Sequence, residues 1–402
     1  MKVGIIGGGA AGLAAAAFCG GDTAIVERNE KVGKKLYITG KGRCNLTNNC
    51  ALYEFFPNIV RGEKFMISSL TAFPPQALME FMGENGLRLK TERGGRVFPA
   101  SDKSSDVIKT LLRAAESRGA KILLDTRVLG VTKDGGGFAV HTDKGDLRFD
   151  RLIVATGGLG YPSTGSTGDG YEIARSFGHS IVPAVPGLAP LLLKDDVSPL
   201  RGLSLRNVRA TVTAGGKSVS EFGEMLFTDD GVSGPIILTL VSRTNRLPLA
   251  GAKLSVDLKP ALSPDTLDDR LTSDLGEMRN KDIANILTML MPKALIPYVL
   301  ERSGVPPHVK GNSVTRAQRY AVGFCVKNLT FTIERADDVK KAIITSGGVD
   351  LKEVDPRTME SKLVPGLYFA GEVLDVDALT GGYNLQCAFA TGRSAGIAAG
   401  SK

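Results

Sequence analysis

The first twelve residues constrain the fold of this chain more than any other stretch. An apolar run at residues 3–6 predicts a buried strand. Gly7, Gly9 and Gly12 follow at the spacing G-x-G-x-x-G, and residues 10–18 predict a helix. A helix that begins directly after such a turn directs free N–H groups and the positive end of its dipole at a phosphate. We therefore expect a dinucleotide pyrophosphate to contact Gly7, Gly9, Ala10, Ala11 and Gly12.

A carboxylate follows the second predicted strand. The apolar run at residues 23–26 ends in Glu27, at the distance where this motif places an acid on the ribose hydroxyls. Glu27 also repels a 2′-phosphate, and Arg28 beside it is a further candidate contact of the cofactor. A secretory signal peptide is the alternative interpretation of the apolar start. Lys2 alone makes a poor basic region for one, and glycines interrupt the apolar stretch.

Composition and charge narrow the class of protein. The chain has 402 residues, of which 43% are hydrophobic and 23% charged. It contains no apolar run of membrane-spanning length, so we expect a soluble, cytoplasmic protein of two or three domains. The formal net charge is +8. Lys and Arg are dispersed along the sequence, which does not favour a nucleic acid as partner.

The cysteines and histidines argue against several kinds of site. Five cysteines without a C-x-x-C pair indicate free thiols in a reducing compartment. Three histidines lie far apart in the sequence, which does not favour a zinc site or a Ser-His-Asp triad. We expect no metal, and we expect Cys44 to be structural because no partner at disulfide-exchange spacing accompanies it.

A loop rich in Gly and Lys follows the nucleotide strands. Residues 31–48 are too polar and flexible in composition to be core, and we expect them to wrap the cofactor. Arg43 is suited to pairing with phosphate, and Asn45 to hydrogen bonding with phosphate, ribityl or ring. An exposed turn with ordinary surface lysines is the alternative. The candidate cofactor contacts of this loop are Lys34, Lys35, Gly42, Arg43 and Asn45.

The middle of the first half predicts peripheral helices and then a β-meander. Residues 58–120 are expected to be mainly helical, with an amphipathic helix at 104–118. Short strands follow at 127–132, 137–142 and 146–149, and a buried strand ends in Ala155, Thr156 and Gly157. This order of elements is similar to that of the glutathione-reductase-like flavoproteins. That resemblance implies contacts of the nucleotide with Ala155, Thr156, Gly157 and Val128.

The last part of the chain indicates a flavin. A predicted strand at 367–370 ends in Gly371 and Glu372, and a helix is predicted at 384–399 after a second glycine turn. A nicotinamide site needs no such second anchor, whereas the ribityl chain and isoalloxazine ring of FAD do. A helix start aims N–H groups at the ring where reduced flavin is anionic. The candidate contacts are Gly371, Glu372, Asp375, Gly382, Tyr383, Asn384 and Leu385.

The composition changes between these two anchors and suggests an inserted domain. Prolines at residues 182–193 are typical of a linker. We expect an α/β fold in which residues 1–188 plus 341–402 form a Rossmann-like FAD-binding domain of glutathione-reductase type. Residues 189–340 would form an inserted β-rich domain. Its β module would span 189–260 and 320–340, and its helical subdomain 261–319.

Long motifs resemble one bacterial family. They are residues 40–48, 161–170, 231–235, 371–375 and 381–386. They resemble the FAD-dependent flavoproteins that include aminoacetone-oxidase-like and bile-acid-reductase-like (BaiN-like) NAD(P)/FAD-dependent oxidoreductases. The resemblance covers nearly the whole chain and implies a FAD domain split by an inserted region. The chain departs from the family at Thr228-Asp229-Asp230, where a Thr-His usually precedes the Gly-x-Ser-Gly-Pro turn.

These patterns predict a FAD-dependent oxidoreductase. Hydride would pass between a small organic substrate and flavin N5, with NAD(P)H as a possible transient donor and oxygen as a possible acceptor. The sequence identifies no catalytic acid, base or nucleophile. It leaves open an RNA-modifying flavoprotein and a redox-silent FAD-binding protein. It does not decide between an oxidase and a reductase, and it does not predict an oligomeric state.

Overall fold

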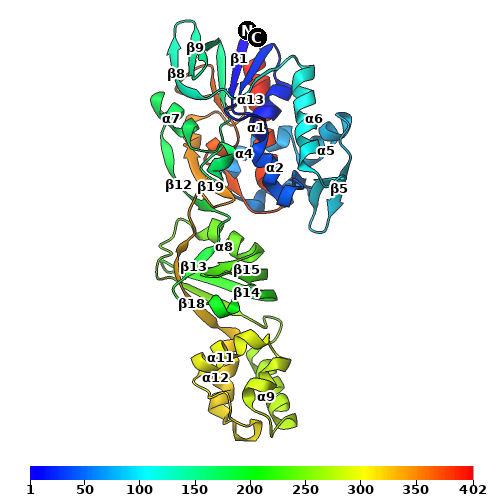
Figure 1. The fold of residues 1–402 in the computed structure, drawn as a ribbon, viewed down its shortest axis with the longest axis vertical. Coiled ribbons are helices and arrows are strands. Elements are labelled where there is room, and N and C mark those ends of the chain that lie inside the picture. The colour runs from blue at the N-terminus through cyan, green and yellow to red at the C-terminus, as the bar shows by residue number, and fades with distance from the viewer. Residues whose placement is uncertain (402) are drawn as a thin grey trace. The chain divides into compact units, whose positions relative to one another are not determined.

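The computed structural model describes residues 1–401. The chain forms two compact units. Unit 1 comprises Met1–Gly187 and the segment from Val339 onward, and unit 2 comprises Leu188–Asp338. Figure 1 shows helices packed around a sheet in unit 1, and a strand-rich part with helices in unit 2. The fold class is thus the expected one, a Rossmann-type domain interrupted by a β-rich insertion.

A parallel sheet forms the centre of unit 1. Its strand order is β20-β11-β1-β2-β7, with every neighbouring pair parallel. The interior residues of β1, β2 and β11 are buried because helices cover the sheet, as is usual for parallel strands. The strands span Lys2–Ile6 (β1), Asp22–Val26 (β2), Lys121–Leu123 (β7), Arg151–Val154 (β11) and Leu367–Phe369 (β20).

Two helices from opposite ends of the sequence cross on this sheet. Helix α1 spans Ala10–Phe18, as predicted, and α13 spans Tyr383–Gly400 (Figure 1). A Cβ atom on Gly392 would lie 2.3 Å from the Ala11 carbonyl oxygen, and one on Gly396 would lie 2.2 Å from that of Ala15. Only glycine permits this approach. Helix α1 is buried on all sides, since residues 11–17 are all buried.

The remaining elements of unit 1 include more strands than expected. The meander matches the prediction, with β8 at Val128–Asp134, β9 at Gly137–Thr142 and β10 at Gly145–Phe149. Residues 58–120, expected to be mainly helical, also form β4 (Ile59–Arg61), β5 (Leu89–Glu92) and β6 (Arg96–Pro99). Helices still make up more than half of this stretch, so the expectation holds, and the Arg93-Gly94-Gly95 turn adds a polar hairpin that was not predicted. The helices are α3 (Leu52–Phe55), α4 (Glu63–Ala72), α5 (Pro75–Glu84), α6 (Ser104–Ser117) and α7 (Asp169–Ser176).

Two segments predicted as loop or linker are ordered elements. The 31–48 loop contains α2 (Lys34–Ile38) and β3 (Thr47–Asn48). The proline-rich 182–193 stretch forms β12 (Ile181–Gly187) and β13 (Leu191–Leu193) instead of a linker. Strand β12 (Ile181–Gly187) admits Pro183 because its pairing with β19 (Ile344–Val349) skips register between Val182 and Val185. A short β21 (Asp377–Ala378) pairs with β4.

Unit 2 combines a barrel with a helical part. Strands β13-β16-β15-β14-β17-β18 close the barrel, with β14 at Ser204–Ala214, β15 at Lys217–Phe227, β16 at Gly231–Ser233, β17 at Lys253–Asp257 and β18 at Leu329–Ala336. The helices are α8 (Pro235–Thr244), α9 (Pro264–Glu277), α10 (Ile283–Ile286), α11 (Ile296–Ser303) and α12 (Arg316–Lys327). Helix α12 extends beyond the predicted end of the helical region at residue 319, because the Thr315–Gln318 capping box starts it late.

Candidate functional site

The glycine turn after β1 has the geometry that a phosphate requires. Gly7 has a φ of 102°, which favours glycine. A Cβ on Gly12 would lie 1.9 Å from the Gly7 carbonyl oxygen, so the helix packs directly on the turn. Helix α1 has no side-chain cap and no acid in its first turn. Its free N–H groups therefore face a region with no atom within 4 Å of the position of a Gly9 Cβ.

Glu27 is held by hydrogen bonds to N–H groups. It is 6% exposed. One carboxylate oxygen accepts from the Gly8 N–H at 2.8 Å, and the other accepts from the Asn29 backbone N–H at 2.9 Å and from its side-chain amide at 2.6 Å. Arg28 turns to another partner, since its guanidinium donates to Thr167 and pairs with Asp169 at 3.0 Å. Glu27 is thus placed beside the glycine turn.

The cations of the 31–48 loop lie in different local environments. Lys34 pairs with Glu30 at 2.9 Å and contacts Asn29. Lys35 pairs with Glu372 at 2.6 Å. Arg43, predicted on phosphate, instead pairs with Glu92 and with Asp102 and lies over the Phe98 ring. The sequence predicted that all three cations contact the cofactor. In the structure each of them pairs with a different carboxylate or pair of carboxylates.

Three other residues of this loop have distinct environments. Gly42 has a φ of 84° and no atom within 4 Å of the position of a Cβ. The buried Asn45 Oδ1 has no hydrogen-bond partner among the described residues. Burial raises the pKa of the Cys44 thiol to about 12, so this cysteine is unreactive as a thiolate, in line with its expected structural role.

The end of β11 lies against the first glycine turn. The Ala155 N–H donates to the Ile6 carbonyl at 2.9 Å, and the Ala155 carbonyl is 2.6 Å from the position of a Gly7 Cβ. The buried Thr156 Oγ1 has no partner among the described residues, and Gly157 has a φ of 76°. Val128 begins β8, directly after a segment in which the Thr126 N–H donates to the Glu27 carbonyl at 3.0 Å.

The C-terminal turn reaches the same place from the far end of the sequence. A Cβ on Gly371 would lie 2.7 Å from the Cβ of Ala11 on α1. Glu372 accepts from Lys35 and from the Thr345 N–H at 2.8 Å. Asp375 is 6% exposed and accepts from two nitrogens of the Arg61 guanidinium.

The start of α13 is the second helix N-terminus of the site. Gly382 has a φ of 99°, and the helix carries no side-chain cap and no acid in its first turn. Tyr383 packs edge-on against Phe55, and burial raises its pKa to about 12, which keeps the phenol protonated. Asn384 is occupied by backbone groups, since it accepts from the Ala378 N–H and donates to the Ala378 and Leu379 carbonyls. Leu385 packs against the core.

The residues present fit FAD. Two uncapped helix starts, open space beside Gly9 and Gly42, and two buried oxygens without partners are what a long phosphate-bearing ligand would satisfy. Glu27 lies at one helix start and Tyr383 begins the other. The contact between Ala11 of α1 and Gly371 connects the two helix starts.

Several residues of the site were missed by the sequence analysis. Thr345 orients Glu372, and Arg61 holds Asp375. Thr47 donates to Gln386 at 2.7 Å, beneath the start of α13. Thr47 and Gln386 lie in motifs quoted above, so their positions could have drawn notice. Arg61 and Thr345 stand in no motif, and nothing local marks them.

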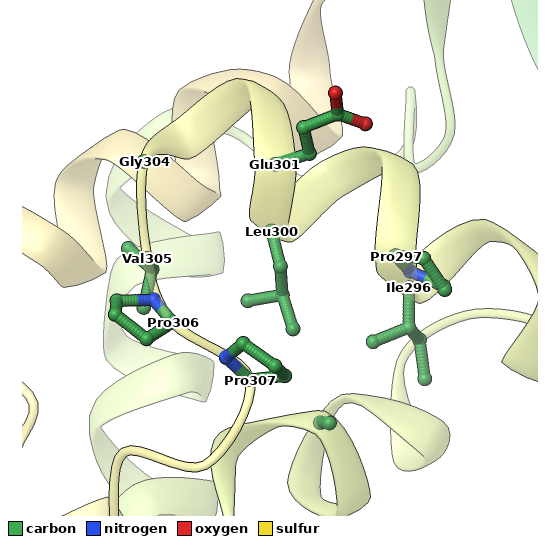
Figure 2. A pocket seen from close by; sticks show the side chains of 9 residues that line it. Ile296, Pro297, Leu300, Glu301, Gly304, Val305, Pro306 and Pro307 are labelled. Carbon is green, nitrogen blue, oxygen red and sulfur yellow. The ribbon is translucent and has the colours of Figure 1, made fainter.

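A membrane-spanning helix and a metal centre are both absent from the described residues. Within residues 1–401, no helix is long and apolar enough to cross a membrane, and no group of His, Cys, Asp and Glu is arranged to hold a metal ion. Figure 2 shows an apolar pocket of about 570 Å³ in unit 2, formed by α11, Ala284 of α10 and the loop that follows α11. Prolines form much of its wall, and Glu301 is its one charged residue. It contains none of the predicted cofactor residues.

Comparison with known proteins places this architecture in a family. The model of the HI0933-like protein Rossmann domain matches residues 1–398. The chain belongs to this family. The HI0933-like proteins are FAD-dependent, and the chain is therefore a flavoprotein of the FAD-binding Rossmann oxidoreductases.

Two curated relatives match along their full length. The chain is 34% identical over 411 residues to a 3-dehydro-bile acid delta(4,6)-reductase of Clostridium scindens, covering 100% of this chain and 99% of the relative. It is 31% identical over 393 residues to a ribosomal RNA dihydrouridine synthase of Escherichia coli, covering 96% and 95%. The resemblance to bile-acid-reductase-like flavoproteins is thus confirmed.

Solved structures support the fold. A 3-ketosteroid delta1-dehydrogenase from Sterolibacterium denitrificans superimposes with a TM-score of 0.51 at 16% identity, covering 99% of each chain. The FrdA subunit of Escherichia coli quinol fumarate reductase gives 0.50 at 16% identity, covering 99% of this chain and 70% of that one. At this identity the likeness concerns the fold alone.

Proposed function

We propose that the chain is a FAD-dependent reductase of a carbon–carbon double bond conjugated to a carbonyl group, with NAD(P)H as electron donor. The names of the two full-length relatives support this reaction class. A delta(4,6)-reductase of a 3-dehydro-bile acid saturates double bonds conjugated to a ketone. A dihydrouridine synthase saturates the uracil double bond beside a carbonyl. The two substrates differ in size and share this reactive group.

The observation that carries the proposal is the pair of uncapped helix starts in unit 1. The start of α1 with Glu27 suits the ADP half, and the start of α13 suits the flavin half. FAD, when bound, supplies hydride transfer in either direction. The chain's own residues bind and orient it: N–H groups of α1 face the pyrophosphate, and the positive end of α13 favours the anionic, reduced ring.

The side chains around the second helix start also supply a protonated group. Tyr383 begins α13, and its pKa of about 12 keeps the phenol neutral over the physiological range. A conjugated double bond needs a proton at the carbon next to the carbonyl as well as hydride at the other carbon. The phenol of Tyr383, the first residue of α13, is the candidate donor.

A second candidate concerns the substrate rather than the reaction. A free small molecule is the substrate expected from the sequence. A uridine in RNA is the alternative, and the 31% identity to a ribosomal RNA dihydrouridine synthase favours it specifically. The NAD(P)H and substrate assignments belong to the proposal.

Anaerobic reduction tests the proposal. Purified yellow protein is mixed with NADH or NADPH while the flavin absorbance is followed, and a steroid 4-en-3-one or a uridine-rich RNA is then added. We expect bleaching by a nicotinamide and return of the yellow colour with one of the two acceptors. Bleaching that only oxygen reverses contradicts the reductase, and bleaching by an amine instead of a nicotinamide indicates an oxidase. Protein purified without any flavin contradicts the cofactor itself.

A further inference from the structure

The β5–β6 hairpin of unit 1 gathers cations that are far apart in the sequence. Because side chains alternate along a strand, Lys90 and Glu92 face the same side of β5, and the exposed Arg88 directly precedes this strand. Lys90 is paired across the hairpin with Phe98, and Glu92 with Arg96. This places a row of charged side chains on one face of a small sheet, around a buried aromatic ring.

The 40–43 turn adds two more cations to this face. The guanidinium of Arg43 lies 4.2 Å from the centre of the Phe98 ring, and that of Arg96 lies 5.9 Å from it. Gly40 also lies against Phe98, which brings the exposed Lys41 alongside. We call this face the hairpin surface; its cations are Lys41, Arg43, Arg88, Lys90, Arg93 and Arg96.

Two carboxylates neutralise only part of this charge. Glu92 and Asp102 form ion pairs with Arg43, Lys90 and Arg96, and the hydrogen bonds from Lys90 and Arg43 lower the pKa of Asp102. Lys41, Arg88 and Arg93 are exposed and form no ion pair with an acid among the described residues. The pairs fix the shape of the surface, while the three remaining cations leave it strongly positive.

The hairpin surface adjoins the start of α13. Asn48 donates from its side-chain amide to the Gly94 carbonyl at the hairpin tip, at 2.9 Å, and to the Gly381 carbonyl at 3.2 Å. Gly382, which follows, packs on the backbone of Thr47 in β3, the strand that pairs with β6. One side chain therefore connects the cationic tip to the turn that precedes the flavin-facing helix.

We propose that the hairpin surface docks the phosphate backbone of an RNA and so positions a base near the start of α13. The cations extend over two strands and a turn and lie in the open, which suits a row of phosphates better than one small anion. Phosphate contacts carry no sequence information, so binding through these cations is expected to be insensitive to sequence. This inference rests on the proposed function, because reductase chemistry gives a reason to hold a macromolecule at this place.

Charge reversal tests the surface without altering the cofactor residues. The probe is a fluorescein-labelled RNA hairpin of about 20 nucleotides, bound to the oxidised holoprotein and followed by fluorescence anisotropy at several salt concentrations. Arg88→Glu with Arg93→Glu removes two cations that form no ion pair among the described residues. The matched control, Lys64→Glu with Arg113→Glu, makes the same charge change on α4 and α6.

We expect the R88E/R93E protein to bind at least about tenfold more weakly and with a shallower salt dependence, since each phosphate contact contributes roughly 0.7 to 0.9 to the slope. The control should stay within about threefold of the wild type. Flavin content and melting temperature identify a misfolded variant, and R88Q/R93Q then replaces it.

Equal loss in both charge-reversal proteins overturns the proposal, as does binding that neither changes. Preference for anionic lipid vesicles over RNA also overturns it. The binding assay contains no electron donor, so it measures RNA binding independently of reduction. If the protein binds RNA at this surface but reduces neither acceptor in the reduction assay, the docking proposal holds and the proposed reductase function fails. If the protein reduces a steroid enone but does not bind RNA, the reductase function holds and the docking proposal fails.

Discussion

The two carboxylate anchors of unit 1 are held in different ways. Glu27 accepts hydrogen bonds from N–H groups only, two of them from the backbone; the donors are Asn29, two residues away, and Gly8, 19 residues away. Glu372 and Asp375 each accept from a cation that lies more than 300 residues away, Lys35 and Arg61 respectively. The first anchor is assembled by one βαβ unit, whereas the second requires the whole of unit 1.

Because of this difference, substitutions at the two anchors should affect cofactor binding and folding stability to different extents. The Glu27 carboxylate is in place once β1 has paired with β2 and the glycine turn has formed. A carboxylate fixed by a distant cation depends on tertiary packing, and it joins chain segments when it forms. Changes at the first anchor should therefore affect the cofactor more than stability, and changes at the second should affect both.

The largest effect is expected at the first glycine turn, where fold and ligand can be separated. Gly12→Ala should destabilise the apoprotein by about 3–5 kcal/mol, because its methyl group would collide with the Gly7 carbonyl oxygen. Gly9→Ala has open space and should leave the melting temperature unchanged while weakening FAD binding at least about tenfold. Thermal unfolding measures the stability of each variant, and flavin titration measures its FAD binding. Similar unfolding of both variants would contradict the assignment of Gly9 to the ligand.

An intermediate effect is expected at the second anchor. Arg61→Met leaves the buried Asp375 without its cation and should cost about 2–3 kcal/mol, less than for a fully buried pair because Arg61 is partly exposed. Asp375→Asn in the same protein should restore part of the loss, since the uncompensated charge is gone. Denaturant unfolding of the single and the double variant measures the loss and the recovery of stability. If the second change brings no recovery, Arg61 acts through packing and not through charge.

The smallest effect on stability is expected at the first anchor. Glu27→Gln places an amide donor against N–H donors and should cost about 1–2 kcal/mol of FAD binding with little change in unfolding. The rate and equilibrium of flavin release from the holoprotein measure it. A drop in stability as large as that of Arg61→Met would remove the distinction between the anchors.

Much of the fold could be predicted from the sequence where the determinants are local. The helix at residues 10–18, the meander strands and the helix after Gly382 follow from glycine turns and apolar periodicity. The stretch at 182–193 could not, because its prolines suggest a linker while a register shift admits Pro183 to a strand. The β5–β6 hairpin was missed for a similar reason, since its strands are short and polar.

The candidate site divides in the same manner. Gly7, Gly12 and Glu27 lie together because one motif sets their spacing. The partners of Arg43 could not be predicted, because Glu92 and Asp102 approach it only through the pairing of β3 with β6. The sequence therefore showed dispersed charge where the fold brings charge together.

The glycine crossing of α1 and α13 orders events in the making of the protein. On the ribosome, the fingerprint helix is made more than 360 residues before its neighbour with Gly392 and Gly396. Until that neighbour emerges, the small-residue face of α1 has no partner and β20 is missing from one edge of the sheet. The sheet and the second helix start are therefore completed only after the segment from β20 to α13 has been added to the nascent chain.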